Sequence, residues 1–392
     1  MKSCPEYLCF KIIARVIASV TAALIFSTCA GPNNKSVEKN AETEEIVKVA
    51  RGLEIIKHKD FTEVLIRNPW QGASNVTMKY ILVSDKKYIP ENTSPESVII
   101  VPVRKMVCMS TTHVGMISAL GEENSIKGIS GADFLYSSSL KDRFKKGEIA
   151  EVGYETNINH EIIIKISPDL LMMYGIAGES ASHINKMQEL GFKIMLNGDY
   201  LETDPLAKAE WIRLFGALYC REEKADSIFN SVAENYNRTK TIVSAKSTER
   251  PTVLLGLPFK DTWFISPGNS FVSRLIEDAG GTYIWKNTVS ETSMPYGLEN
   301  VYAQAINADF WINIGTVKRK SEISLVDKRL RDLRCYINGN MYNNNKRVSA
   351  AGGNDYWESG AVNPDIVLMD IASVLHPEIF PDYKPVYYQK IE

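Results

Sequence analysis

The pattern of apolar and polar residues changes character near residue 96 and then alternates regularly. From Val98 onward, short apolar runs alternate with stretches whose apolar residues recur at helical spacing, which is typical of a parallel α/β sheet. Strands of a first lobe are predicted at VIIVPV (98–103), IKGIS (126–130), DLLMM (169–173) and FKIML (192–196). Helices are predicted between them at 111–120, 138–146, 160–166 and 180–190, several ending at a glycine: Gly121, Gly147 and Gly191.

A long helical stretch separates this region from a second one with the same alternation. Asp204-Pro205 is typical of a helix start. We expect a break near Cys220, because the polar run REEK that follows puts acids at the positive end of a new helix over about 222–244. Beyond Pro251, strands are predicted at TVLLG (252–256), TWFIS (262–266) and DFWINI (309–314), and helices at 270–279, 298–306 and 364–375. The sequence therefore predicts two α/β lobes joined by one long helix.

Residues 50–95 precede the first lobe and are rich in β-forming residues. Two runs, Leu53–Arg67 and Met78–Val83, predict strands, and Asn68-Pro69-Trp70-Gln71-Gly72 predicts a turn between them. We expect a small N-terminal β extension, whose role the sequence does not indicate.

The first thirty residues have the pattern of an export signal. Lys2, Lys11 and Arg15 precede an uncharged stretch from Val16 to Thr28, which as a helix would span only ~20 Å of a ~30 Å hydrocarbon core. Small residues followed by Cys29 resemble a bacterial lipobox, in which the cysteine sulfur carries the lipid anchor. A plain signal peptide followed by an unrelated cysteine is the alternative.

Composition and charge narrow the function classes. With 44% hydrophobic and 23% charged residues, the 392-residue chain is typical of a folded protein of two domains. A formal net charge of -2 provides no basic field of the kind that nucleic-acid binding depends on. The GxSxG, HExxH, CxxC and P-loop motifs are absent, which weakens an enzymatic interpretation. We expect Cys108, Cys220 and Cys335 to be small buried apolar side chains, and the sequence does not indicate which of them, if any, would pair.

Three loops carry residues suited to ligand binding. His113 lies where a strand meets its helix, and ligands bind at the carboxyl ends of strands in open α/β sheets. Tyr174 and Glu179 lie in YGIAGE (174–179), after another strand. The loop GGNDYWESG (352–360) combines an acid with two aromatic residues, which suits a planar or amphipathic ligand. A purely structural role is the alternative for each of these residues.

Five segments together resemble the metal-chelate periplasmic binding proteins of ABC importers, which handle vitamin B12, ferric siderophores and haem. They are NHEIIIKISPDLLMMYG, MQELGFKIM, DPLAKAEWIRLFGALY, SPGNSFVSRLIEDAGG and GGNDYWESGAVNPDIVLMDIASVLHPEIFP, within residues 96–390. The chain looks most like the lipoprotein branch found in Bacteroidota. The resemblance implies two Rossmann-like α/β lobes bridged by one rigid helix, with a ligand cleft between them. It also implies a non-enzymatic protein without a resident cofactor or metal, which is anchored in the periplasm and delivers its chelate to a permease.

The resemblance also assigns residues to the site. Thr112 and His113 correspond to the first ligand-facing loop, and Tyr174 and Tyr296 to positions where relatives present aromatic side chains. Asp355, Tyr356 and Trp357 match a loop with an acid and aromatics. Glu179 and Glu299 fall near the two surface glutamates, one in each lobe, that dock onto permease arginines. The helix after Glu299 is longer than its counterpart in the first lobe, so the second docking position stays open by one helical turn.

The implied organisation is a signal peptide (1–28), a tether (29–49), the β extension (50–95), the first lobe (96–220), the interlobe helix (221–246) and the second lobe (247–392). Two other functions stay open. One is an enzyme of the same plan that acts on a tetrapyrrole, with His113, His183 and Asp355 as its reactive groups. The other is a binder of free zinc or manganese that uses His113, His160, His183 and an acid.

Overall fold

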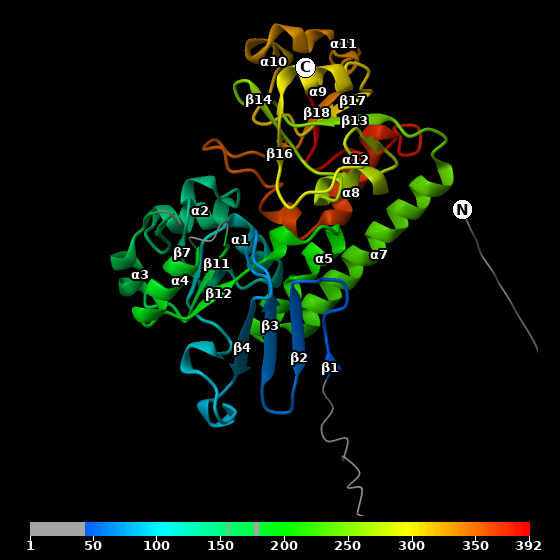
Figure 1. Ribbon diagram of the computed structural model, residues 1–392. Helices are drawn as coiled ribbons and strands as arrows, with labels where there is room; N and C mark the ends of the chain where they lie inside the picture. The colour runs from blue at the N-terminus through cyan, green and yellow to red at the C-terminus, as the bar shows by residue number, and fades with distance from the viewer. Residues whose placement is uncertain (1–43, 155–156, 176–179) are drawn as a thin grey trace, which may run out of the picture. The chain divides into compact units, whose positions relative to one another are not determined.

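The computed structural model describes residues 44–154, 157–175 and 180–392, with the side chains of 180–183 left out (Figure 1). The predicted signal peptide, Cys29 and most of the tether lie outside the described residues, as does Glu179. Among the described helices, none is both long enough and apolar enough to cross a membrane.

The N-terminal extension forms a five-stranded sheet of its own. Its strands lie in chain order: β1 (Glu44–Glu45), β2 (Leu53–Lys57), β3 (Thr62–Arg67), β4 (Thr77–Val83) and β5 (Val98–Ile100). The predicted run Leu53–Arg67 is a hairpin rather than one strand, with His58 and Phe61 hydrogen-bonded across the turn. Val98–Val103 was predicted as a strand of the first lobe, which is wrong. Its first three residues pair in parallel with β4 in the extension, and Pro102 has no N–H to continue the ladder.

The first lobe contains a parallel sheet with the strand order β12-β11-β6-β7-β8. The strands are β6 (Met106–Cys108), β7 (Ile126–Ile129), β8 (Ala150–Glu151), β11 (Leu170–Met173) and β12 (Ile194–Leu196). The predicted helices are confirmed as α1 (Thr111–Leu120), α2 (Ser138–Lys145), α3 (His160–Ile166) and α4 (Ser180–Glu189). The Ser110 hydroxyl caps α1, and Gly121 ends it with a φ of 74°, which a side chain would disfavour. A two-stranded ribbon, β9 (Gly153–Tyr154) with β10 (Asn157–Ile158), follows β8.

Three helices lead to the second lobe: α5 (Pro205–Glu210), α6 (Ile212–Tyr219) and α7 (Glu222–Lys246). The predicted break is confirmed at Cys220, which has a left-handed φ of 54°. Gly216 makes this corner tight, because a Cβ atom there would lie only 2.6 Å from the Cβ of Ala225. Cys220 is exposed, against the prediction that it is buried, whereas Cys108 and Cys335 are buried as predicted. All three cysteines are free.

The second lobe repeats the plan with the strand order β15-β13-β17-β18-β19. Its strands are β13 (Thr252–Leu255), β15 (Thr282–Tyr283), β17 (Phe310–Ile312), β18 (Met341–Asn343) and the antiparallel edge strand β19 (Gln389–Lys390). The run TWFIS does not join this sheet: it forms β14 (Thr262–Ile265), which pairs with β16 (Met294–Gly297) in a separate two-stranded sheet. The helices are α8 (Phe271–Asp278), α9 (Leu298–Ala305), α10 (Lys320–Val326), α11 (Arg334–Ile337) and α12 (Pro364–Leu375).

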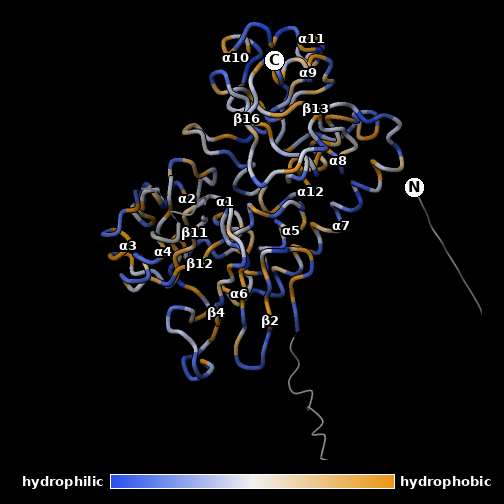
Figure 2. Tube along the Cα trace, in the orientation of Figure 1, coloured by the Kyte–Doolittle hydropathy of each residue, from blue (hydrophilic) through white to orange (hydrophobic). Residues whose placement is uncertain are grey.

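The buried apolar residues of these elements form two main hydrophobic cores. Figure 2 shows the hydrophobic stretches of the chain that contribute to these cores. The first core is shared, because Ile55, Val64 and Ile66 of the extension pack with Phe215 and Leu218 of α6. The second core fills the second lobe. The apolar helix α12 packs along α7, as Figure 1 shows. The fold is therefore α/β, with one parallel sheet, one mainly parallel sheet, one long helix and a β extension that shares the core of the first lobe. The described residues also contain seven 3₁₀ turns, at 86–88, 95–97, 123–125, 132–134, 199–201, 328–332 and 359–361.

Candidate ligand-binding site

The carboxyl edge of the first sheet carries the loops in which ligand residues were predicted. Ser110–His113 follows β6, and Tyr174 follows the neighbouring strand β11, so their side chains emerge from adjacent strand ends. Thr112 is partly exposed, and its hydroxyl lies 2.9 Å from that of Ser110. Parallel strands present their ligand-facing loops at this edge.

His113 lies beneath this edge rather than on it. The residue is 0% exposed, and its ring centroid lies 6.5 Å from that of Tyr174 and 6.4 Å from that of Phe215. Within the described part of the chain, neither ring nitrogen has a hydrogen-bond partner. Burial lowers the pKa of His113 from 6.5 to about 3, so the imidazole is neutral at physiological pH. The structure therefore places His113 in the core and Thr112 at the surface.

The loop 352–360 comes from the second lobe, and most of it is packed. The Asp355 carboxylate is buried and pairs with Arg347, with 2.7 Å between Oδ2 and Nε. Tyr356 is also buried, and its ring makes edge-on contacts with Trp357, Tyr387 and Tyr388 at centroid distances of 4.8, 6.1 and 6.1 Å. Trp357 is 53% exposed. Of the three residues predicted in this loop, only Trp357 is exposed enough to contact a ligand, and Tyr356 packs against its ring.

Glu358, which the sequence analysis passed over, fastens this loop to the first lobe. Its buried carboxylate accepts hydrogen bonds from the backbone N–H groups of Tyr136, at 2.6 Å, and Ser137, at 3.1 Å. Burial raises the pKa of Glu358, and these two hydrogen bonds oppose the rise. A Cβ atom on Gly115 of α1 would lie 2.0 Å from the Glu358 carbonyl oxygen, so only glycine permits this contact. In the sequence, the feature that could have indicated Glu358 is the composition of its loop, an acid flanked by glycines.

Two exposed aromatic residues at the same edge were also missed. Phe134 and Tyr154 follow β7 and β8, and both are more than half exposed. A Cβ atom on Gly131 would lie 3.1 Å from the Phe134 ring and 3.5 Å from the Tyr154 ring, so the two rings flank this glycine. The Glu151 carboxylate orders both loops by accepting backbone N–H groups from Gly131, Ala132 and Gly153 at 2.6–3.0 Å. The run DFLY (133–136), shortly after the predicted strand 126–130, could have indicated Phe134 but not Tyr154.

Tyr296 belongs to a separate aromatic group in the second lobe. It lies on β16 opposite Trp263, half-buried, with its ring centroid 6.4 Å from that of Trp285.

Glu299 is strongly exposed, as the docking prediction requires. It lies in the first turn of α9 with 75% of its side chain accessible, and its Oε1 accepts a hydrogen bond from Arg329 Nη1 at 3.0 Å. That hydrogen bond holds the pKa of Glu299 below its usual value. Arg329 also pairs with Asp327 at 2.8 Å. Arg329 would therefore keep an acidic partner if Glu299 formed an ion pair with an arginine of the permease.

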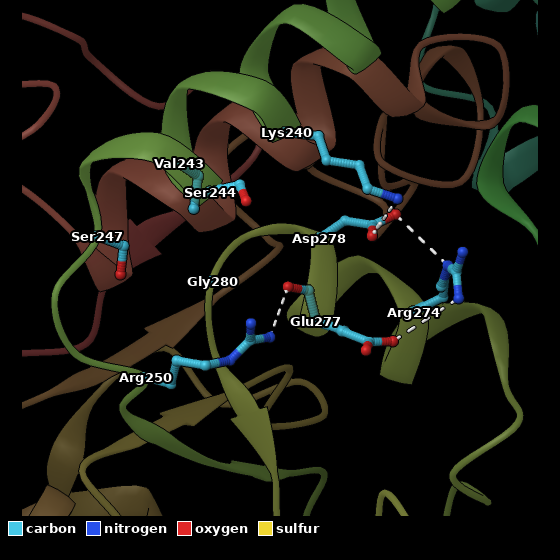
Figure 3. A pocket seen from close by; sticks show the side chains of 9 residues that line it. All are labelled: Lys240, Val243, Ser244, Ser247, Arg250, Arg274, Glu277, Asp278 and Gly280. Atoms are coloured by element: carbon cyan, nitrogen blue, oxygen red, sulfur yellow. Dashed lines mark hydrogen bonds and ion pairs between the residues drawn. The ribbon is translucent and has the colours of Figure 1, made fainter.

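The pocket in Figure 3 lies elsewhere, between α7 and α8, and has a volume of about 250 Å³. Its charged side chains are largely paired with one another: Lys240 and Arg274 both reach Asp278, at 2.8 and 3.6 Å. A second pocket of about 590 Å³ lies around Cys220. None of the predicted ligand residues lines either pocket.

The structure does not favour the free-metal alternative. Among the described residues, no three His, Cys, Asp or Glu side chains gather closely enough to hold a metal ion. His113 is enclosed by aromatic rings, and the side chain of His183 lies outside the described part.

Known proteins are similar to this chain in sequence or in fold. An uncharacterized lipoprotein of Methanocaldococcus jannaschii is 25% identical, with 97% of this chain and 96% of the relative aligned. A periplasmic heme binding protein from Pseudomonas aeruginosa has a similar structure, with a TM-score of 0.56 at 15% identity over 74% of this chain and 98% of that one. A protein of an ABC-type Fe3+-hydroxamate transport system from Saccharomonospora viridis gives a TM-score of 0.52 at 18% identity, over 71% and 93%.

The sequence itself matches a family model. Residues 106–331, more than half of the chain, match the model described as periplasmic binding protein, from the first strand of the first lobe into the second lobe. With its two mainly parallel sheets and its one long helix, this chain belongs to the periplasmic binding protein family.

Proposed function

We propose that this protein captures a metal chelate (cobalamin, haem or a ferric siderophore) and delivers it to the permease of an ABC importer. The exposed aromatic side chains at the carboxyl edge of the first sheet carry this proposal. Phe134 and Tyr154 rise from the first lobe, and Trp357 is held against that lobe by Glu358. Similar structures named for heme binding and for Fe3+-hydroxamate transport support the ligand class.

The chemistry of these residues suits binding without turnover. Aromatic rings supply large apolar contact at low entropy cost, and they stack on porphyrins, corrins and catecholates alike. Thr112 adds a hydroxyl that can donate to or accept from the chelate. The relatives named lipoproteins support a lipid anchor, for which Cys29 is the proposed attachment site, and the match to the periplasmic binding protein model supports a place in the periplasm.

A panel of coloured chelates tests the proposal directly. The full chain, solubilised in detergent, is titrated with haemin, cyanocobalamin, a ferric hydroxamate and a ferric catecholate, and the absorption spectrum reports binding. We expect saturable one-to-one binding of at least one member. Failure of all four to bind a folded protein would refute the proposal.

Trp357→Ala is expected to weaken binding of the chelate by ~2 kcal/mol, about thirtyfold in affinity, because the substitution removes the whole contact between the aromatic ring and the ligand. The affinity for the probe that the panel identifies is measured by titration. Phe264→Ala is the matched control: this ring is also more than half exposed, but it lies on the face of the β14–β16 ribbon opposite to Tyr296. Equal affinities of wild type and Trp357→Ala would remove Trp357 from the site.

Docking onto the permease is assigned to Glu179 and Glu299, one acid in each lobe. Exposed rim charges act mainly on association rate and orientation, so the double change to alanine is expected to impair uptake by cells while sparing chelate affinity. Transport of the labelled chelate is measured beside binding by the purified protein. Glu277→Ala serves as the control, because this exposed acid is also paired with an arginine, Arg274. Normal uptake by the double variant would contradict the assignment.

A tetrapyrrole-acting enzyme is the second candidate, and the geometry favours it less. Two of its three reactive groups are sequestered: His113 is buried between aromatic rings, and Asp355 is paired with Arg347. Incubation with haemin distinguishes the two functions, since an enzyme would change the product spectrum with time and a binding protein would not.

A further inference from the structure

The turn between β3 and β4 brings the N-terminal extension to the candidate site. Trp70 in this turn forms an isolated parallel β-bridge with Gly175, the second residue after β11. The Gly175 carbonyl also accepts a hydrogen bond from the Tyr200 hydroxyl, beyond the end of β12. The turn Asn68–Asn75 therefore lies at the carboxyl edge of the first sheet, beside Tyr174.

The turn has a defined shape. Asn68 has a left-handed φ of 46°, and its N–H donates to the Val76 carbonyl at 2.8 Å. The Asn68 side-chain oxygen accepts from the Val76 N–H at 3.1 Å, and the Ala73 N–H donates to Trp70 at 3.0 Å. These bonds fix the direction in which Trp70 and Gln71 leave the backbone.

The extension that carries the turn is fastened to the first lobe. The Glu202 carboxylate accepts N–H groups from Arg51 and Gly52, both at 2.9 Å, and the Glu210 carboxylate accepts three more from Lys48, Val49 and Ala50. Apolar residues of β2 and β3 belong to the first core. The turn is thus a fixed part of the first lobe.

The two side chains at the tip of the turn reach in different directions. Trp70 is half-buried and packs on the apolar cluster that includes Tyr174 and Met173. The Gln71 amide donates to the carbonyl of Glu291, in the second lobe, at 2.9 Å. The turn therefore touches both lobes, beside a residue predicted to face the ligand.

We infer that the turn Asn68–Asn75 forms a third wall of the ligand site and that the Trp70 ring contacts the bound chelate. This inference rests on the proposed function and adds a residue that selects the ligand. The extension precedes the family match at residues 106–331, yet the relative from M. jannaschii aligns over 97% of this chain. The extension thus lies outside the region that the family model matches, but within the region that aligns with this relative.

Three substitutions at Trp70 separate ligand contact from packing. Trp70→Phe keeps an aromatic ring, Trp70→Leu keeps only apolar bulk, and Trp70→Ala removes both. Each is titrated with the probe that the wild type binds best and with the other members of the panel. We expect Trp70→Phe to retain affinity, and Trp70→Leu and Trp70→Ala to weaken binding by about tenfold and to alter the order of preference among the probes.

Tyr88→Ala is the matched control. This half-buried aromatic belongs to the same extension but packs near Val83, at the other end of β4, about 20 Å along the strand from the turn. It should leave affinity unchanged. Wild-type affinity and preference in a folded Trp70→Leu protein would overturn the inference and leave the proposed function intact. A wild type that binds no probe would refute both.

Discussion

Glu210→Ala is expected to lower the free energy of unfolding by about 3–5 kcal/mol, because it removes a buried carboxylate that accepts three backbone hydrogen bonds and pairs with the largely buried Arg213. The Glu210 side chain is completely buried. Its two carboxylate oxygens accept the backbone N–H groups of three successive residues, Lys48, Val49 and Ala50, at 3.0, 2.6 and 2.8 Å. Arg213 lies 3.7 Å away and would lose an ion-pair partner as well.

Urea unfolding of the variant and the wild type measures this loss, and hydrogen exchange at residues 48–50 locates it. Glu54→Ala is the control: Glu54 is an acid of the same extension and pairs with Arg67 at 2.6 Å, but it is partly open to solvent. An exposed pair contributes only about 0–1 kcal/mol, so this variant should unfold much like the wild type. Equal stability of both variants would show that Glu210 does not anchor the extension.

His113→Phe is expected to remove a large part of the acid sensitivity of the protein. Burial lowers the pKa of His113 to about 3, whereas in the unfolded chain it stays near 6.5. Between these values only the unfolded state takes up the proton, so the wild type loses about 1.4 kcal/mol of stability per pH unit as the pH falls. At about pH 4.5 the loss due to His113 amounts to roughly 2–3 kcal/mol, and phenylalanine does not incur it.

Unfolding free energies of wild type and His113→Phe between about pH 7 and pH 4.5 test this expectation. Burial raises the pKa values of acids such as Asp199 and Glu202. Both proteins contain these acids, so their contribution is removed when the unfolding free energy of one protein is subtracted from that of the other. At neutral pH the variant should be at least as stable, since both imidazole nitrogens are buried and neither has a hydrogen-bond partner among the described residues. A parallel pH dependence of the two proteins would place the imidazole in contact with water. Loss of chelate affinity in the variant would instead indicate that the imidazole ring of His113 contributes to the ligand site.

In the second lobe, the local sequence pattern predicted a strand but not the sheet to which that strand belongs. The run TWFIS has the composition of a buried strand, and Trp263 and Ile265 are indeed buried. Nothing local distinguishes a strand of the central sheet from one of a separate ribbon, because that choice depends on the partner strand. Here the partner is β16, some thirty residues away.

The loop 352–360 shows the same limit at the site. Its sequence indicated an acid and two aromatic residues in a glycine-flanked loop, but not which of them would be covered. Tyr356 is covered by Tyr387 and Tyr388 from the end of the chain, and Asp355 by Arg347. Trp357, which has the same apolar character, stays exposed. Such burial is a property of distant segments that meet.

The sequence by itself determined the class of fold and many of the local elements. Period and capping set the helices α1, α3 and α12 to the residue, and the left-handed break at Cys220 followed from the acids that begin the next helix. These features depend on neighbours within one helical turn. Only the tertiary structure decided that Val98 belongs to the extension, that His113 is enclosed and that Trp70 meets Gly175. Each of these is set by pairing or packing between segments far apart in the chain, which no local pattern of residues encodes.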